Sequence, residues 1–296
     1  MIDGIHFEIP VETIMNNDIL EFRSNGDRYR AKYKGLILDR YTQSCKINGS
    51  IHKYFNNGVH NYNDFTLSNY ITALNDLSKV LNITPGFIRI GRIEIGVNID
   101  LDIDTDVNEF LSSVFMLEYK IPEMLGQIGF IFKFREYDLK IYSKELEKCR
   151  DRLRIELVVK HKSKRDVIIK EFAPFCNTLE DLTNSNVWRA FGLELLKVFG
   201  NIIIIDKENI DYGSLNPKEE KILINGSNPF YWKKDWSRQT RNNHLNRFLS
   251  VIRTKGGNDI KEAMRAKIEA KINELIDIDN VPSYQQCKIK SDSIFF

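Results

Sequence analysis

Two stretches within residues 132–165 alternate apolar residues with large polar ones. Because successive side chains of a β-strand point to opposite faces, each stretch collects its polar side chains on one face. A phenol and a carboxylate lie there among cations: Lys140, Tyr142, Lys144, Arg152, Arg154 and Glu156. A phenol can attack phosphorus as a covalent nucleophile, and guanidinium and ammonium groups bind phosphate oxygens. These residue types therefore suit chemistry on a phosphodiester.

A third stretch, residues 87–103, adds Arg92, Glu94 and Asn98 on its polar face. If the three strands are neighbours, Glu94 and Glu156, helped by an amide or imidazole, can hold a hard divalent cation such as Mg²⁺ or Mn²⁺. The cation would polarise the phosphodiester and favour the phenolate of Tyr142. An ordinary solvated sheet face is the alternative. Thr and Ser, which are common on exposed strands, are nearly absent from these faces.

The strand predicted over residues 44–55 brings a histidine to the same site. His52 falls on the polar face of that strand and is the better candidate for an accessory metal ligand. His60 follows an Asn-Asn-Gly turn and is predicted to lie in a polar loop. Tyr137 is the rival nucleophile, but alternation points it with Leu139 and Ile141 into the core.

Hydrophobic periodicity along the whole chain predicts an α+β fold. Strands are expected over residues 29–39, 44–55, 87–103, 127–134, 136–144 and 151–160, and residues 201–206 are either a short apolar strand or a helix end. Helices are expected over residues 65–83, 106–117, 165–173, 178–183, 187–199, 216–226, 243–256 and 258–278. This order favours a largely antiparallel central sheet with flanking helices, followed by a mostly helical C-terminal part. The predicted domains are residues 1–210, which carry the chemistry, and the helical region 211–296.

Composition places the chain among ordinary cytoplasmic proteins. No apolar run of about 18 residues is present, so no membrane span is expected. The first residues lack the basic start and apolar core of a secretory signal peptide. The cysteines are scattered without a CxxC pair, which predicts reduced thiols rather than disulfides or a zinc site: Cys45, Cys149, Cys176 and Cys287.

Basic residues concentrate in the C-terminal third. Residues 228–267 hold 10 Lys and Arg against 3 Asp and Glu. Several of them are expected to contact nucleic-acid phosphates: Lys233, Lys234, Arg238, Arg241 and Arg247. Tyr231, Trp232 and Trp236 could stack on bases, although packing in a hydrophobic core is the preferred interpretation. The apolar stripe through Met264 and Ile268 either packs on the same chain, which we favour, or serves a homodimer.

Five short motifs in a fixed order resemble a known family. They are "GSIHKYFNNGVHNYNDF", "RIEIGVNID", "LKIYSK", "LRIEL" and "INGSNPFYW", spread over residues 49–232. Together they resemble the rolling-circle replication initiators of the Rep_trans type. Such initiators are found in plasmids and phages, including the mobile elements of Bacteroidetes. Members of that family nick one strand of origin DNA, remain attached through a 5′-phosphotyrosine, and leave a 3′-OH that primes synthesis.

The resemblance assigns roles to the residues that match its motifs. It implies that Tyr142 is the nucleophile, that Lys144 and Arg154 belong to the catalytic motifs, and that Glu94 and Glu156 bind the metal. Asn98 stands where the family has an aspartate, so this position departs from the pattern. Apart from the resemblance, the cations of the sheet face are expected to bind phosphate oxygens of the DNA: Arg92, Lys140 and Arg152.

Two functions follow as expectations. The first is a metal-dependent nickase that initiates rolling-circle replication in the cytoplasm of a bacterial host. The second is a DNA-binding protein that recognises an origin and recruits a host helicase or polymerase without cleaving DNA.

Overall fold

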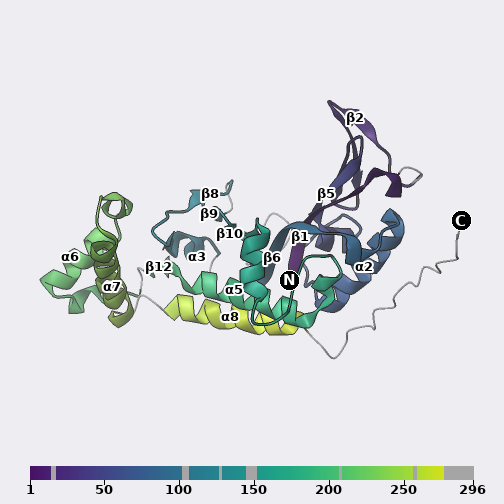
Figure 1. Ribbon diagram of the computed structural model, residues 1–296. Helices are drawn as coiled ribbons and strands as arrows, with labels where there is room; N and C mark the ends of the chain where they lie inside the picture. The colour runs from purple at the N-terminus through teal and green to yellow at the C-terminus, as the bar shows by residue number, and fades with distance from the viewer. Residues whose placement is uncertain are drawn as a thin grey trace, which may run out of the picture.

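The computed structural model describes residues 1–14, 18–101, 107–126, 129–144, 152–206, 209–255 and 259–276. Its main element is a ten-stranded sheet in the order β2-β3-β4-β5-β1-β6-β11-β10-β9-β8, and a small second sheet pairs β12 with β7. Neighbouring strands are antiparallel (Figure 1). The predicted α+β fold with a largely antiparallel sheet and a helical C-terminal part is confirmed.

The strands are β1 (Ile2–Pro10), β2 (Arg23–Asn25), β3 (Arg28–Tyr33), β4 (Leu36–Arg40), β5 (Ser44–Ser50), β6 (Ile90–Asp100), β7 (Val114–Leu117), β8 (Glu123–Met124), β9 (Gly129–Lys133), β10 (Tyr137–Ser143), β11 (Arg152–Val159) and β12 (Ile202–Ile204). The α-helices are α1 (Ile51–Phe55), α2 (Leu67–Leu81), α3 (Val107–Ser113), α4 (Lys162–Ile169), α5 (Ser185–Gly200), α6 (Pro217–Gly226), α7 (Arg238–Thr254) and α8 (Asp259–Leu275). Short 3₁₀ turns are η1 (Val11–Thr13), η2 (Pro85–Phe87), η4 (Asp181–Thr183), η5 (Tyr212–Ser214) and η6 (Pro229–Lys233).

The central strands bury their apolar faces under two long helices. Ile93, Ile95 and Val97 of β6, with Leu153 and Ile155 of β11, lie in the main hydrophobic core. Helices α5 and α8 contact β6, and Figure 1 shows them side by side along the sheet. The alternation that predicted these strands therefore reflects one apolar face against helices and one polar face opposite.

Strand β1 was not predicted, although it lies in the middle of the sheet between β5 and β6. Its alternating Ile5, Phe7 and Ile9 are buried in the core. The register with β6 shifts between Ile2 and Ile5. A shift of this kind turns the preceding residues relative to the pleat, and it decides where Asp3 points.

The strand predicted over residues 44–55 is wrong beyond Ser50. Ser50 caps helix α1, and its side-chain oxygen accepts a hydrogen bond from the backbone N–H of Lys53 at 2.9 Å. Ile51 and Tyr54 then bury one helical face. His52 therefore belongs to a helix and not to the polar face of a strand.

Helix α2 begins after Thr66, whose side chain accepts a hydrogen bond from the backbone N–H of Asn69 at 3.2 Å. The predicted helix 106–117 is correct for α3, whereas residues 114–117 form β7. Cys45 and Cys176 are buried free thiols, whereas Cys149 and Cys287 lie outside the described residues. None of the described helices combines the length and the apolar character needed to cross a lipid bilayer.

The C-terminal part divides between two hydrophobic cores. Helices α6 and α7 with turn η6, here called the helical lobe, pack on Met116 of β7 and Ile203 of β12 in a second core. Helix α8 instead places Met264, Ile268 and Ile272 in the main core beside α5. The favoured packing of this helix within the chain is confirmed. The helical lobe lies at one end of the molecule, and strands β2–β5 extend at the other (Figure 1).

Candidate active site on the central sheet

Three adjacent strands bring most of the predicted site residues onto one face of the sheet. Strand β11 lies between β6 and β10. Arg154 stands opposite Tyr142 on one side and Asn98 on the other. Glu156 stands opposite Lys140 in the next row. The expectation that the three polar faces are neighbours is thereby confirmed.

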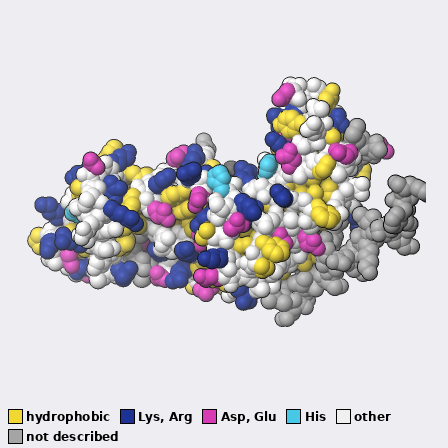
Figure 2. Space-filling model, viewed as in Figure 1, with side chains coloured by type: hydrophobic (Ala, Val, Ile, Leu, Met, Phe, Trp, Pro, Cys, Tyr) yellow, Lys and Arg dark blue, Asp and Glu magenta, His cyan; other side chains and the backbone are white. Residues whose placement is uncertain are grey.

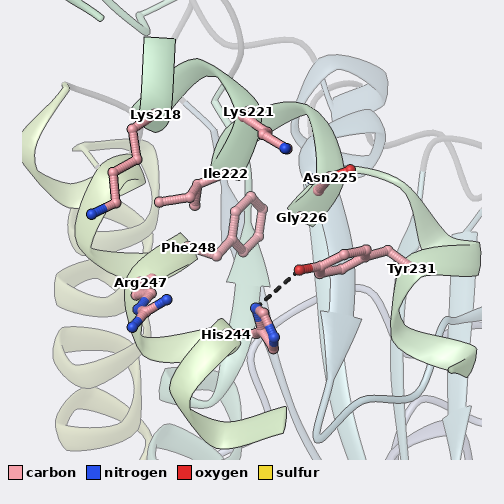
Figure 3. A pocket seen from close by; sticks show the side chains of 9 residues that line it. All are labelled: Lys218, Lys221, Ile222, Asn225, Gly226, Tyr231, His244, Arg247 and Phe248. Carbon is pink, nitrogen blue, oxygen red and sulfur yellow. Dashed lines mark hydrogen bonds between the residues drawn. The ribbon is translucent and has the colours of Figure 1, made fainter. Parts of the chain in front are cut away.

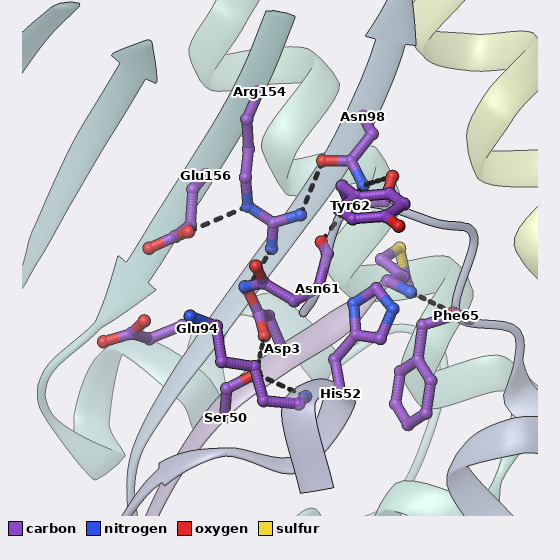
Figure 4. Close-up of polar contacts among 12 residues, drawn as sticks. Asp3, Ser50, His52, Asn61, Tyr62, Phe65, Glu94, Asn98, Arg154 and Glu156 are labelled. Atoms are coloured by element: carbon purple, nitrogen blue, oxygen red, sulfur yellow. Dashed lines mark hydrogen bonds and ion pairs between the residues drawn. The ribbon is translucent and has the colours of Figure 1, made fainter. Parts of the chain in front are cut away.

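A buried arginine occupies the centre of this face. Arg154 is 2% exposed and donates to Glu156 Oε2 at 3.0 Å, Asn98 Oδ1 at 2.8 Å and Asp3 Oδ2 at 2.5 Å (Figure 4). Gly96 leaves space for the guanidinium, because a Cβ there would lie 3.0 Å from Nη2 of Arg154. Oxygen acceptors thus surround a fixed internal cation on three sides.

Asp3 is a site residue that the sequence pattern missed. It is buried and accepts hydrogen bonds from Ser50 Oγ and, at 2.8 Å, from Asn61 Nδ2. Asn61 in turn accepts from Lys144 Nζ at 2.8 Å, which places Lys144 in the same network. A strand signal was present in the alternation of Ile5, Phe7 and Ile9. Strict alternation, however, would have put Asp3 on their apolar face.

Two glutamates face the same ammonium group. Lys140 Nζ lies 2.7 Å from Glu156 Oε1 and 3.8 Å from Glu94 Oε2. Burial and the negative charge of Glu156 raise the pKa of Glu94 to about 7. Burial also opposes ionisation of Glu156, but the charges of Arg154 and Lys140 outweigh it and lower its pKa. One carboxylate is therefore firmly ionised, and its neighbour titrates near neutrality.

The phenol of Tyr142 points at Glu156. Its hydroxyl donates to Glu156 Oε2 at 3.2 Å, and Lys144 Nζ lies 5.6 Å from the ring centroid. Burial and the charge of Glu156 raise the pKa of Tyr142. The side chain is half-buried. Tyr137, by contrast, is buried as predicted, with its hydroxyl 3.3 Å from Glu118 Oε1.

Residues 56–66, here called the covering loop, close one end of the polar face. Asn98 Nδ2 donates to the carbonyl oxygens of Tyr62 at 3.0 Å and Asn63 at 3.3 Å. Arg152 Nη1 donates to the carbonyl of Tyr62 at 2.6 Å. His52 is buried under this loop, with Nε2 2.7 Å from Asn63 Oδ1. Asn98, Arg152 and His52 thus all engage the loop.

The predicted metal ligands are only partly brought together. Glu94 and Glu156 both face Lys140, so these two carboxylates are the residues that would hold a divalent cation. Asn98 Oδ1 is already bonded to Arg154, and His52 is bonded to the covering loop. Burial lowers the pKa of His52 to about 4, so the ring is neutral at pH 7. Among the described residues, no group of three His, Cys, Asp or Glu side chains is arranged to hold a metal ion.

The open edge of the polar face carries two predicted DNA contacts. Arg92 pairs with Glu94 at 3.0 Å, and its side chain is 43% exposed. Lys140 is partly exposed beside it. Both cations can reach a ligand from solvent. Arg152 is paired bidentately with Asp100 and holds the loop instead.

The remaining predicted DNA contacts lie in the helical lobe, away from the sheet. Lys233, Lys234, Arg238 and Arg247 are exposed, and Arg241 is half-buried. Figure 2 shows many Lys and Arg side chains and few acidic ones over this lobe. The aromatic residues divide: Trp232 is buried in the second core as predicted, whereas Phe230 is 73% exposed.

Comparisons of the chain with protein-family models, with curated proteins and with solved structures found no match. The resemblance to replication initiators therefore stays a prediction from the quoted motifs.

Proposed function

We propose that this protein is a replication initiator that binds DNA and transfers one strand to Tyr142. The supporting observation is the contact of the Tyr142 hydroxyl with Glu156, a carboxylate that also binds Lys140 and Arg154. A nucleophile, an acceptor for its proton and two accessible cations for phosphate oxygens, Lys140 and Arg92, thus share one face. The basic helical lobe supplies a second surface for the same strand.

In the proposed reaction, Oη of Tyr142 attacks the phosphorus of a phosphodiester. A phosphorus–Oη bond forms and the bond to the 3′ oxygen breaks, which gives a 5′-phosphotyrosine and a free 3′-OH. The phenol proton passes to the carboxylate pair, and the leaving 3′ oxygen takes up one proton. Glu156 accepts the hydrogen bond of the phenol hydroxyl at 3.2 Å and is therefore the first acceptor of its proton. Lys140 and Arg92 neutralise the phosphate oxygens.

A divalent cation belongs to this proposal as a cofactor. Glu94 and Glu156 would hold Mg²⁺ or Mn²⁺, which when bound supplies positive charge to phosphate oxygens. The ammonium of Lys140 would then be released towards the solvent edge. We therefore expect covalent attachment of DNA to require Mg²⁺ or Mn²⁺, and the experiment below includes EDTA to test this dependence.

The test is covalent capture of DNA by the full-length chain. A pool of labelled single-stranded and hairpin DNA of random sequence is incubated with the protein, with Mn²⁺ or with EDTA, and run on a denaturing protein gel. We expect a labelled band with Mn²⁺ that disappears in Tyr142→Phe, while Tyr137→Phe, a matched loss of one phenol hydroxyl, retains it. A band that persists in Tyr142→Phe would exclude this residue as the nucleophile.

A second candidate function is non-cleaving recognition of origin DNA, followed by recruitment of host replication proteins. The observation that favours it is electrostatic: Lys140 and Arg154 already compensate the carboxylates, and the surroundings raise the pKa of Tyr142. Under this alternative, the protein retards the DNA pool on a native gel, but no labelled band survives denaturation with any divalent cation.

A further inference from the structure

A small basic cavity in the helical lobe lies apart from the sheet face. It opens between α6, turn η6 and α7 and has a volume of about 180 Å³. At about 30 Å³ per water molecule, it holds about six waters. It is thus smaller than the ~300–1,000 Å³ that drug-sized ligands occupy. A cavity of this size suits one compact group, such as a phosphate.

Three cations line this cavity from two helices. Lys218 and Lys221 come from α6 and Arg247 comes from α7, around the buried ring of Phe248 (Figure 3). All three cationic side chains are exposed. Among the described residues, none of the three has an ion pair with an acidic side chain. The uncompensated positive charge points to an anionic ligand.

The cavity has a rigid aromatic wall. The hydroxyl of Tyr231 and Nδ1 of His244 hydrogen-bond at 3.0 Å, and His244 stacks on Trp236 with ring centroids 4.5 Å apart. A Cβ on Gly226 would lie 2.1 Å from Cδ2 of Phe248, so the glycine is needed where the two segments cross. Packing therefore holds the wall in place before any ligand binds.

Aromatic and basic side chains alternate just outside the cavity. Lys234 Nζ lies 5.0 Å from the ring centroid of Tyr231 and 5.7 Å from that of Trp236. Lys233 lies 5.0 Å from the ring centroid of Phe230, which is largely exposed. Proteins that bind single strands combine such stacking rings with cations for the backbone. Aromatic rings beside lysine side chains favour a nucleic-acid strand as the ligand over a phosphorylated peptide.

We propose that the cavity lined by Lys218, Lys221 and Arg247 binds one phosphate group of single-stranded DNA, while Phe230 offers a stacking surface for an adjacent base. The proposal deepens the proposed function because it shares the DNA partner. Binding of a phosphate in the cavity requires no reaction at Tyr142. The cavity proposal and the proposed strand transfer can therefore be disproved separately.

The test measures binding of a labelled 12-nucleotide single strand to the full-length chain by fluorescence anisotropy over a range of salt concentrations. We expect Lys221→Gln and Arg247→Gln each to weaken binding about tenfold, or about 1.4 kcal/mol. Each should also reduce the slope of log K against log salt by about 0.7, the value for one phosphate contact on a single strand.

Arg253→Gln is the matched control. It removes the same charge from the same helix at an exposed position that does not line the cavity. Losses of equal size in Arg253→Gln and Arg247→Gln would overturn the proposal, because they would show general attraction to a basic lobe. Unchanged binding in both cavity variants would overturn it as well.

Competition with inorganic phosphate shows whether the cavity binds free phosphate or only a phosphate within a DNA strand. If phosphate displaces the strand from wild-type protein more strongly than chloride at equal ionic strength, the cavity accepts free phosphate. If phosphate does not displace the strand more strongly than chloride, while the cavity variants lose affinity, the site binds phosphate only within a strand.

Quenching of tryptophan fluorescence by the bound strand gives a second measurement on wild-type protein, because Trp236 stacks on His244 of the cavity wall. A phosphoserine peptide that binds more tightly than the strand would contradict the assignment to DNA.

Discussion

Glu94 and Glu156 face one ammonium group, yet their environments give them opposite charge behaviour. Glu156 is almost fully buried and touches both Lys140 and Arg154, so it stays ionised. Glu94 lies farther from Lys140, at 3.8 Å, and pairs with the partly exposed Arg92. The negative charge of Glu156 opposes the ionisation of Glu94. Pairs of titratable groups with separated pKa values are a common feature of sites for acid–base chemistry.

The raised pKa of Glu94 gives stability a defined pH dependence. The folded protein binds this proton more tightly than the unfolded chain, so the contribution is full below pH 4.5 and is lost as pH rises to about 7. At about 1.4 kcal/mol per pKa unit, the change from 4.5 to about 7 corresponds to a loss of roughly 3–4 kcal/mol. We expect Glu94→Gln to remove this decline and to be more stable than wild type at pH 8. Urea unfolding from pH 4 to 8 measures it, and an unchanged profile would show that Glu94 is not perturbed.

Arg154 should be the most sensitive charged residue of the site. Arg154→Ala leaves Asp3 and Glu156 buried without their shared cation, which costs about 3–5 kcal/mol of unfolding free energy. Arg92→Ala removes the same charge at an exposed position and should cost less than about 1 kcal/mol. Equal losses in urea unfolding at pH 7 would contradict a central role for Arg154.

Strand alternation and helical periodicity act locally, and both could be predicted from the sequence. The polar faces of β6, β10 and β11 followed from period-two patterns, and the apolar periodicity of residues 65–83 predicted α2. Asp3 could not be placed, because a register shift in β1 overrides the alternation. His52 was misplaced, because the side chain of Ser50 starts a helix where the apolar pattern fits a strand equally well. The covering loop depends on contacts 35 to 37 residues apart, which no local pattern encodes.

Asn98 should control how firmly the covering loop is held. Asn98→Ala removes the donor to the loop carbonyls, so backbone amides of residues 59–64 should exchange with deuterium faster, while those of α2 remain unchanged. Asn48→Ala, on β5 of the same sheet and exposed, is the matched control and should leave the loop as protected as in wild type. Equal protection in Asn98→Ala would mean that other contacts hold the loop.

The molecule is organised around two hydrophobic cores joined by the small β7–β12 sheet. The main core lies beneath the candidate site, and α8 returns from beyond the helical lobe to complete it. The sequence suggested one boundary near residue 210, because helices dominate after that point. Helix α8, which follows that boundary, packs in the main core through contacts with α5.

The crossing of α5 and α8 offers a test of this arrangement. A Cβ on Gly192 would lie 2.4 Å from Cγ2 of Ile272, so Gly192→Ala should separate the helices and cost about 1–3 kcal/mol. Gly200→Ala is the control on the same helix, because nothing lies within 4 Å of its added Cβ. The midpoint temperature of thermal unfolding should be lower for Gly192→Ala than for both the wild type and Gly200→Ala. A neutral Gly192→Ala would place α8 elsewhere.

The most direct test of the proposed strand transfer is to locate the covalent bond itself. The protein is incubated with the DNA pool and Mn²⁺, digested with nuclease and trypsin, and its peptides are analysed by mass spectrometry. We predict that the peptide containing Tyr142 gains the mass of a 5′-linked nucleotide on that residue. A nucleotide on another tyrosine, or unmodified Tyr142 in protein that demonstrably binds the DNA, would contradict the proposal.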